Sequence, residues 1–163
     1  MAKMTIKGPE EYMAKLTKLG KDSVKICENA VKVGGGIVAD EVRSALESLP
    51  EDKFRRLQDN EKFSGVPKNP KQDLLDSFGV TPVSRSKDGI INVKIGFDGY
   101  GSYKTKKYPN GVPNPLLARA IESGSSVRKK TPFIRKAVNR SKKRAVEEMS
   151  KSIKMELKKY ALN

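Results

Sequence analysis

The sequence predicts an α+β protein in which a long N-terminal helix is followed by a small antiparallel β-hairpin sheet, a short helix and a long basic C-terminal helix. Two observations support this class. Apolar residues recur every three or four positions over residues 24–49 and again over 134–157, as on one face of a helix. Between these stretches, apolar and polar residues alternate over 91–97, as in a half-buried strand. The length of 163 residues fits one domain spanning 1–163.

The N-terminal helical region has identifiable start and stop signals. Pro9–Glu11 favours a helix start, because proline suits the first turn and acids favour the positive end of the helix dipole. We expect this first helix to pause near Gly20. Asp22 then caps a longer amphipathic helix that continues to Leu49, where Pro50 ends it.

Three consecutive glycines, Gly34–Gly36, lie in the middle of this helix. Each glycine costs about 1 kcal/mol relative to alanine in a helix interior. Two interpretations therefore stay open. The helix kinks or breaks at the triplet, or the glycines allow a close helix–helix crossing within or between subunits. Cys27 falls on the apolar stripe of the same helix, and we expect it to be a small buried hydrophobic residue.

The middle of the chain predicts a long loop and then a hairpin. Residues 51–71 carry mixed charge and prolines, which favours a surface loop. Val80–Arg85 is a strand candidate that Pro82 confines to a sheet edge or a bulge. Ser86–Gly89 has the composition of a hairpin turn, and Ile91–Phe97 is the returning strand.

The last third predicts a loop and two helices. Residues 98–114 are rich in Gly, Pro, Tyr and Lys and form a second long loop. Asn114-Pro115 should cap and begin a short helix that Gly124 ends. The final helix should open after Thr131-Pro132 and continue to about Ala161, with one apolar stripe and a heavily charged remainder.

The composition argues against an enzyme. The chain has no His, which removes His bases and His-ligated metal sites, and its single Cys excludes a Cys-cluster metal site within one chain. Asp73 and Asp76 are too few for a hard-cation site, and we expect Asp73 to cap a short helical turn instead. Gly96–Gly101 lacks the spacing and the Lys-Ser/Thr pair of a phosphate loop. We therefore expect no catalytic residues, no metal and no cofactor.

The N-terminal residues Met1–Thr5 lack the apolar stretch of a secretory signal, and no apolar run approaches the ~20 residues of a membrane span. We therefore expect assembly in the cytoplasm and no membrane partner.

Positive charge is concentrated near the C-terminus. The formal net charge is +15, and residues 128–159 hold 13 basic and 3 acidic side chains, a net of +10. The densest groups suggest contact with phosphate or with an acidic protein surface; a solvated helix face carries equal weight. These groups are Arg128, Lys129 and Lys130, and then Lys142, Lys143 and Arg144.

Five short motifs follow one another along the chain: Leu49-Pro50, Asp73–Ser77, Ile95–Asp98, Leu117–Ser125 and Pro132–Ala137. In this order they resemble the small tail-completion (neck, or head–tail joining) proteins of long-tailed bacteriophages and prophages. Each motif alone is weak, and the order is the more specific signal. The chain departs from the family at Lys71-Gln72, where a Thr-Gly pair is usual, and residues 51–71 are longer than is typical.

This resemblance implies a structural protein of the virion neck that assembles into a ring-shaped connector in the host bacterial cytoplasm and performs no catalysis. The implied partners are copies of the chain itself, other neck, portal-connector or tail-tube proteins, and DNA passing through the neck. Phe133 and Arg135 are interface candidates, and a core position is the favoured alternative for Phe133. A different function that fits the charge is a small basic nucleic-acid-binding protein without catalysis.

Overall fold

The structure, a computed structural model, describes residues 9–53 and 55–161 and confirms the α+β class. The sequence expectations for Met1–Thr5 lie outside these residues. The elements in chain order are α1 (Pro9–Glu47), α2 (Lys68–Ser77), β1 (Phe78–Val80), β2 (Ser84–Arg85), β3 (Ile91–Asn92), β4 (Ile95–Phe97), α3 (Asn114–Ser123) and α4 (Phe133–Ala161).

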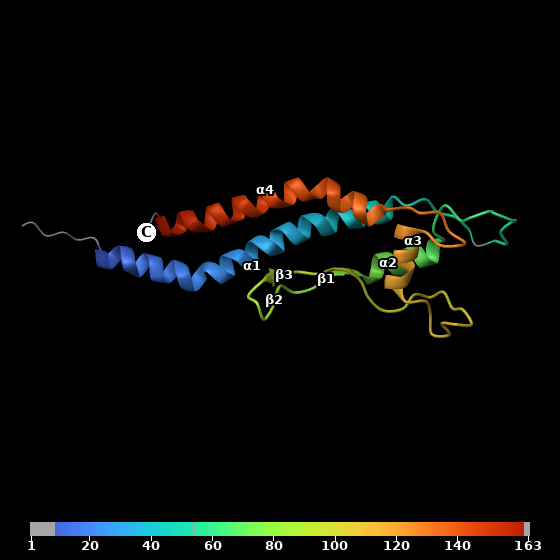
Figure 1. Ribbon diagram of the computed structural model, residues 1–163, viewed down its shortest axis with the longest axis horizontal. Coiled ribbons are helices and arrows are strands. Elements are labelled where there is room, and N and C mark those ends of the chain that lie inside the picture. Colours follow the sequence, from blue (N-terminus) through green and yellow to red (C-terminus); the bar gives the residue numbers. More distant parts are fainter. Residues whose placement is uncertain (1–8, 54, 162–163) are drawn as a thin grey trace, which may run out of the picture.

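The two long helices lie antiparallel side by side and give the molecule an elongated shape (Figure 1). Together α1 and α4 form a two-helix arm that reaches one end of the molecule (Figure 1). The short helices α2 and α3 gather at the other end of the molecule, with the long loops beyond them (Figure 1). We call this second region the loop end.

The helix α1 is continuous, so the predicted pause at Gly20 and the predicted cap at Asp22 are wrong. The carboxylate of Asp22 instead accepts a hydrogen bond from the Tyr160 hydroxyl of α4 at 2.7 Å. This contact joins the two helices near the far end of the arm. Cys27 is exposed rather than buried, because the side of α1 turned inward carries Ile26 and Ala30.

The glycine triplet marks a close crossing inside the subunit and not a break. A Cβ atom added at Gly34 would lie 2.5 Å from the Met149 sulfur of α4. One added at Gly35 would lie 2.6 Å from Cγ1 of Val93, in the hairpin. Gly36 faces open space. Two of the three glycines thus allow α4 and the hairpin to approach α1 closely.

The hairpin is built from two short antiparallel pairs, β1 with β4 and β2 with β3. The predicted single strand Val80–Arg85 is wrong: the strand begins at Phe78 and is interrupted around Pro82, which has no N–H to donate to a ladder. The expected turn is present, since the Ser86 amide donates to the Ile90 carbonyl at 2.9 Å and Gly89 has φ +80°.

Helix boundaries depart from the sequence expectations in three places. The first long loop is shorter than expected, because α2 begins at Lys68, and Asp73 therefore lies inside α2 rather than at its cap. Asn114 is the first residue of α3 and does not cap it; its buried side chain donates to the Asp98 carbonyl at 2.9 Å. Gly124 ends α3 with φ +79°, as expected.

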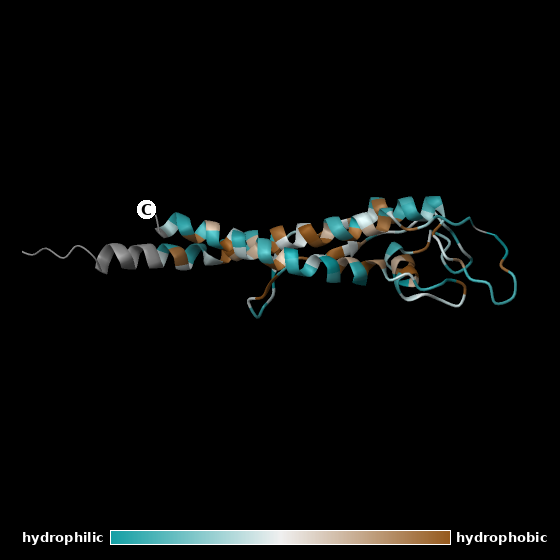
Figure 2. Cartoon of the chain, turned by 90° about the horizontal axis from the view of Figure 1, so that it is seen from above, coloured by the Kyte–Doolittle hydropathy of each residue, from teal (hydrophilic) through white to brown (hydrophobic). Residues whose placement is uncertain are grey.

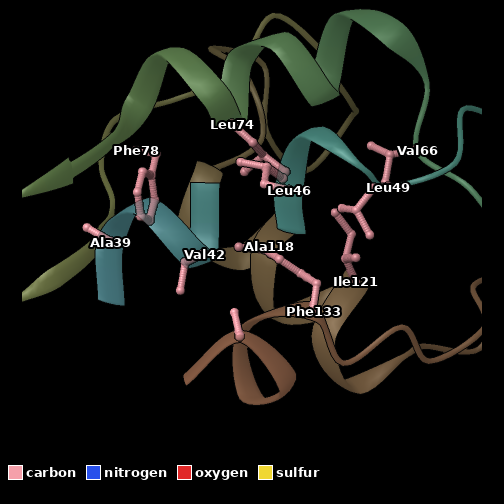
Figure 3. Packing of buried hydrophobic residues seen from close by; sticks show 11 residues of the cluster. Ala39, Val42, Leu46, Leu49, Val66, Leu74, Phe78, Ala118, Ile121 and Phe133 are labelled. Carbon is pink, nitrogen blue, oxygen red and sulfur yellow. The ribbon is translucent and has the colours of Figure 1, made fainter. Parts of the chain in front are cut away.

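The hydrophobic core lies where the C-terminal part of α1 meets α2, α3, β1 and the start of α4 (Figure 3). Aromatic rings extend it into the sheet, with the Phe97 ring 5.3 Å from Phe78 and 6.4 Å from Phe133. Hydrophilic and apolar residues are interspersed along both long helices (Figure 2). The buried cluster comprises Ala39, Val42, Leu46, Leu49, Val66, Leu74, Phe78, Ala118, Ile121, Phe133 and Ala137.

Candidate interaction surfaces at the loop end

An apolar groove of about 760 Å³ opens at the loop end. Its walls come from four separate segments: residues 55–63, the start of α2, the loop and helix over 101–120, and residues 125–128. Leu116 and Val127 are 40% and 54% exposed, so the groove presents apolar surface to solvent. The apolar side chains that line it are Leu57, Phe63, Val112, Leu116, Leu117, Ala120 and Val127.

Arg128 lines this groove and is only 8% exposed, whereas its neighbours Lys129 and Lys130 are exposed. Its backbone is held beside residue 63: the Phe63 amide donates to the Val127 carbonyl at 3.0 Å, and the Lys129 amide donates to the Phe63 carbonyl at 2.8 Å. One guanidinium N–H donates to the carbonyl of Gly65. These bonds turn the Arg128 side chain inward.

Arg128 has no ion-pair partner among the residues that the structure describes. Burial lowers the pKa of its guanidinium, and the charge of Asp52 acts in the opposite direction. Asp52 is already engaged, since its carboxylate accepts hydrogen bonds from Arg55 at 3.1 Å and from the Ser64 amide at 3.4 Å. The protein therefore holds a largely buried cation that donates a hydrogen bond to a backbone carbonyl and has no ion pair within the described residues.

Arg55, also on the groove wall, is in the opposite situation. Its guanidinium pairs with Asp52 and Glu61 and lies 5.6 Å from the centre of the Phe63 ring. The pKa of Glu61 is lowered chiefly by the hydrogen bond from the Gln58 amide, with the Arg55 charge acting in the same direction. Arg55 is thus neutralised within the chain, and Arg128 is not.

A shallow cationic pocket of about 440 Å³ lies on the other side of Arg128. It brings Lys62 together with Lys129 and Lys130, beside Ser123–Ser125 at the end of α3. Lys62 comes from a distant part of the sequence, so its position here follows from the fold alone. No carboxylate lines this pocket.

The second basic group does not join the first. Lys142, Lys143 and Arg144 are exposed on α4, about 15 Å along the helix from its start, at ~1.5 Å per residue. Arg144 lies 3.9 Å from a carboxylate oxygen of Glu41 in α1, and Arg140 pairs with the same carboxylate at 2.9 Å. The α4 face and the cationic pocket are therefore two separate positive surfaces.

The two interface candidates have different environments. Phe133 is 4% exposed and belongs to the core, so the core alternative is confirmed. Arg135 is exposed at the start of α4. There the carboxylate of Glu122, in α3, accepts hydrogen bonds from the amides of Ile134 and Arg135 at 2.9 and 3.1 Å. Glu122 thus satisfies amides that a helix start leaves unpaired.

The 98–113 loop is fastened beside the groove by Asp73. Its carboxylate accepts hydrogen bonds from the amide and the hydroxyl of Ser102, both at 2.7 Å. Gly111 adopts φ +112° and packs directly against the carbonyl of Gly101. The side-chain oxygen of Asn114 is buried near Gly101 without a hydrogen-bond partner in the described structure.

Over residues 9–53 and 55–161, no group of three or more Asp, Glu or Cys side chains could hold a metal ion. In the same part of the chain no helix is both long and apolar enough to cross a membrane. Comparison with known protein families, with curated proteins and with solved structures finds no match.

Proposed function

We propose that this chain is a non-catalytic building block of a bacteriophage neck, which completes the tail or joins head to tail as part of a ring-shaped connector in the virion. The observation that carries the proposal is the amount of apolar surface that the chain leaves exposed on an elongated frame. On the arm, Val146 is 55% and Met155 62% exposed. At the loop end, the apolar groove is open.

Two long helices that pack on each other leave apolar side chains exposed on their outer sides, because each helix buries a single side in the contact. Val33, Val138 and Leu157 are also partly exposed along the arm. At the loop end the groove brings exposed apolar side chains together in one place, and contiguous apolar surface of this kind favours association with other subunits. Head-to-tail contacts between identical subunits close into rings when the rotation allows it.

The structure also gives a physical reason for two of the family motifs to occur together. Leu117–Ser125 contains Glu122, and Pro132–Ala137 supplies the amides that Glu122 binds. The motifs are thus two halves of one helix junction. The partners that the resemblance to neck proteins implies are copies of the chain, other neck, portal-connector or tail-tube proteins, and the DNA that passes between them.

Electron microscopy of particles produced from the source genome tests the proposal. A small epitope tag inserted at the turn Ser86–Gly89, which is exposed, should place an antibody label at the junction of head and tail. The same tag on the major capsid protein provides the control for labelling. Intact particles that carry the tagged gene and show no label at the neck would rule out the proposal.

The cationic pocket favours a second candidate, a small basic nucleic-acid-binding protein without catalysis. Lys62, Lys129 and Lys130 provide several cations around one shallow site. If this is the function, affinity for bare duplex DNA should fall steeply with salt, with a slope of about −0.9 per phosphate neutralised. Replacing Lys129 and Lys130 with Gln should reduce that slope by roughly two phosphate contacts. A weak, salt-insensitive interaction with duplex DNA would dismiss this candidate.

A further inference from the structure

The groove and the inward-turned Arg128 form one site, in which a cation lies among apolar walls. Apolar side chains form most of the groove lining, and the largely buried guanidinium on its wall has no ion-pair partner among the described residues. Burying a charge is unfavourable unless the charge is paired. A carboxylate brought into the groove by another molecule would supply the missing partner.

We propose that the groove binds an apolar segment of a different, acidic protein, and that an Asp or Glu of that segment pairs with Arg128. The planar guanidinium matches a carboxylate through two parallel hydrogen bonds, and such charge-assisted bonds are about twice as strong as neutral ones. The apolar walls formed by Leu116, Leu117 and Val127 accommodate the remainder of the segment. A volume of about 760 Å³ is within the range of ~300–1,000 Å³ of ligand pockets.

The net charge of the chain indicates that the occupant of the groove is a different protein rather than a second copy of this chain. A second copy, which also carries a net +15, gains no long-range attraction to the cationic edge of the groove, whereas an acidic partner does. The lysines around the cationic pocket, Lys62, Lys129 and Lys130, extend this attraction at the edge of the groove next to Arg128.

Nucleic acid fits the groove less well than a protein segment does. A phosphate backbone offers no side chains to fill the apolar walls of the groove. The proposal rests on the proposed function, because it specifies the chemistry of one partner within the neck assembly.

Selection from a displayed library of random peptides on the purified full-length chain tests the proposal. The enriched peptides should contain an Asp or Glu beside aliphatic or aromatic residues. A synthetic copy of the best peptide, and the same peptide with its acid changed to the amide, are then titrated by fluorescence anisotropy. The acidic form should bind about 10- to 100-fold more tightly, as expected for a hydrogen bond to a charged group worth ~1.5–3 kcal/mol.

Three variants locate the interaction. Arg128→Met should fold normally, since apolar replacement of a buried ion is often neutral or stabilising, and should bind the acidic and amide peptides equally. Leu116→Asp places a negative charge in the groove at an exposed position in the first turn of α3, where an acid suits the helix dipole, and should abolish binding of the acidic peptide. The matched control is Ile90→Asp, 63% exposed and outside the groove, which should bind like the unmodified chain.

The outcomes separate this proposal from its alternatives. It is overturned if no peptide is enriched, if the enriched peptides carry no acid, or if Arg128→Met keeps the preference for the acidic form. Displacement of the peptide by short duplex DNA, with equal loss of DNA binding in Leu116→Asp, would assign the groove to nucleic acid instead. Labelling of the particle neck does not depend on these titrations, so the two proposals can fail separately.

Discussion

The glycine triplet of α1 offers a direct test of how the arm is packed, because its three positions differ only in what surrounds them. Replacing a helical glycine with alanine stabilises by about 1 kcal/mol when the new methyl group has space. Gly36 has that space, since no atom lies within 4 Å of an added Cβ. We therefore expect Gly36→Ala to raise the unfolding free energy by about 1 kcal/mol and Tm by roughly 2–4 °C.

At Gly35 the same substitution should be destabilising. The new methyl group would lie 2.6 Å from Cγ1 of Val93, a branched side chain with little freedom to move. Overpacking costs about 1–3 kcal/mol, which exceeds or equals the helical gain, so the net loss is between about zero and 2 kcal/mol. At Gly34 the obstacle is Met149, whose flexible chain can shift, and we expect a result near zero.

Urea unfolding followed by circular dichroism measures all three variants. The decisive control is Gly35→Ala in a Val93→Ala background, where the obstacle is gone and the substitution should become stabilising. If all three single variants change stability equally, or if Gly36→Ala is the most destabilising, the close crossing of α4 and the hairpin over the triplet is incorrect.

Three further predictions concern contacts that join distant parts of the chain. Glu122→Ala should lower the unfolding free energy by about 0.5–2 kcal/mol, because two amides at the start of α4 lose their acceptor; hydrogen exchange of those amides checks the location. Asp73→Ala should release the loop at Ser102, which limited proteolysis detects as faster cleavage within 98–113 with α1 still intact. The pKa of Tyr160 is raised, chiefly by its hydrogen bond to Asp22. This stabilisation is present below the ordinary tyrosine pKa of about 10 and is lost as pH rises through the raised value, so the far end of the arm should lose amide protection in base, and Tyr160→Phe should remove that pH dependence.

The long elements could be predicted from the sequence because their periodic patterns are strong. The hairpin turn at Ser86–Gly89 and the glycine stop at Gly124 also follow from local backbone preferences. Cys27 could not be placed, because residues on both sides of a helical stripe satisfy the same spacing, and only the position of α4 decides which side is buried. The glycine triplet could not be interpreted from the sequence for a similar reason. The loss of helix stability that glycines cause is a local property, whereas the close packing that they allow involves α4 and the hairpin, which are distant in the sequence.

The groove at the loop end gave no signal in the sequence. Its walls come from four segments, and each apolar residue in them, such as Leu57 or Val127, is unremarkable in its own stretch. Lys62 likewise joins Lys129 and Lys130 only through the backbone pairing of residue 63 with residues 127–129. Contacts of this kind depend on long-range topology, which neither periodicity nor charge counting contains.

The run Arg128–Lys130 shows why a cluster of charges in sequence is not necessarily a single functional unit. Backbone pairing beside Phe63 turns Arg128 inward, while Lys129 and Lys130 remain exposed. Three adjacent cations therefore face two different surfaces, an apolar groove and an open cationic pocket. If the run served solubility alone, burying one of its charges without an acid would cost free energy and bring no benefit, since the chain already carries +15. A role in binding accounts for the buried charge, because a partner whose carboxylate pairs with Arg128 removes this free-energy cost and is thereby bound in preference to partners without an acid.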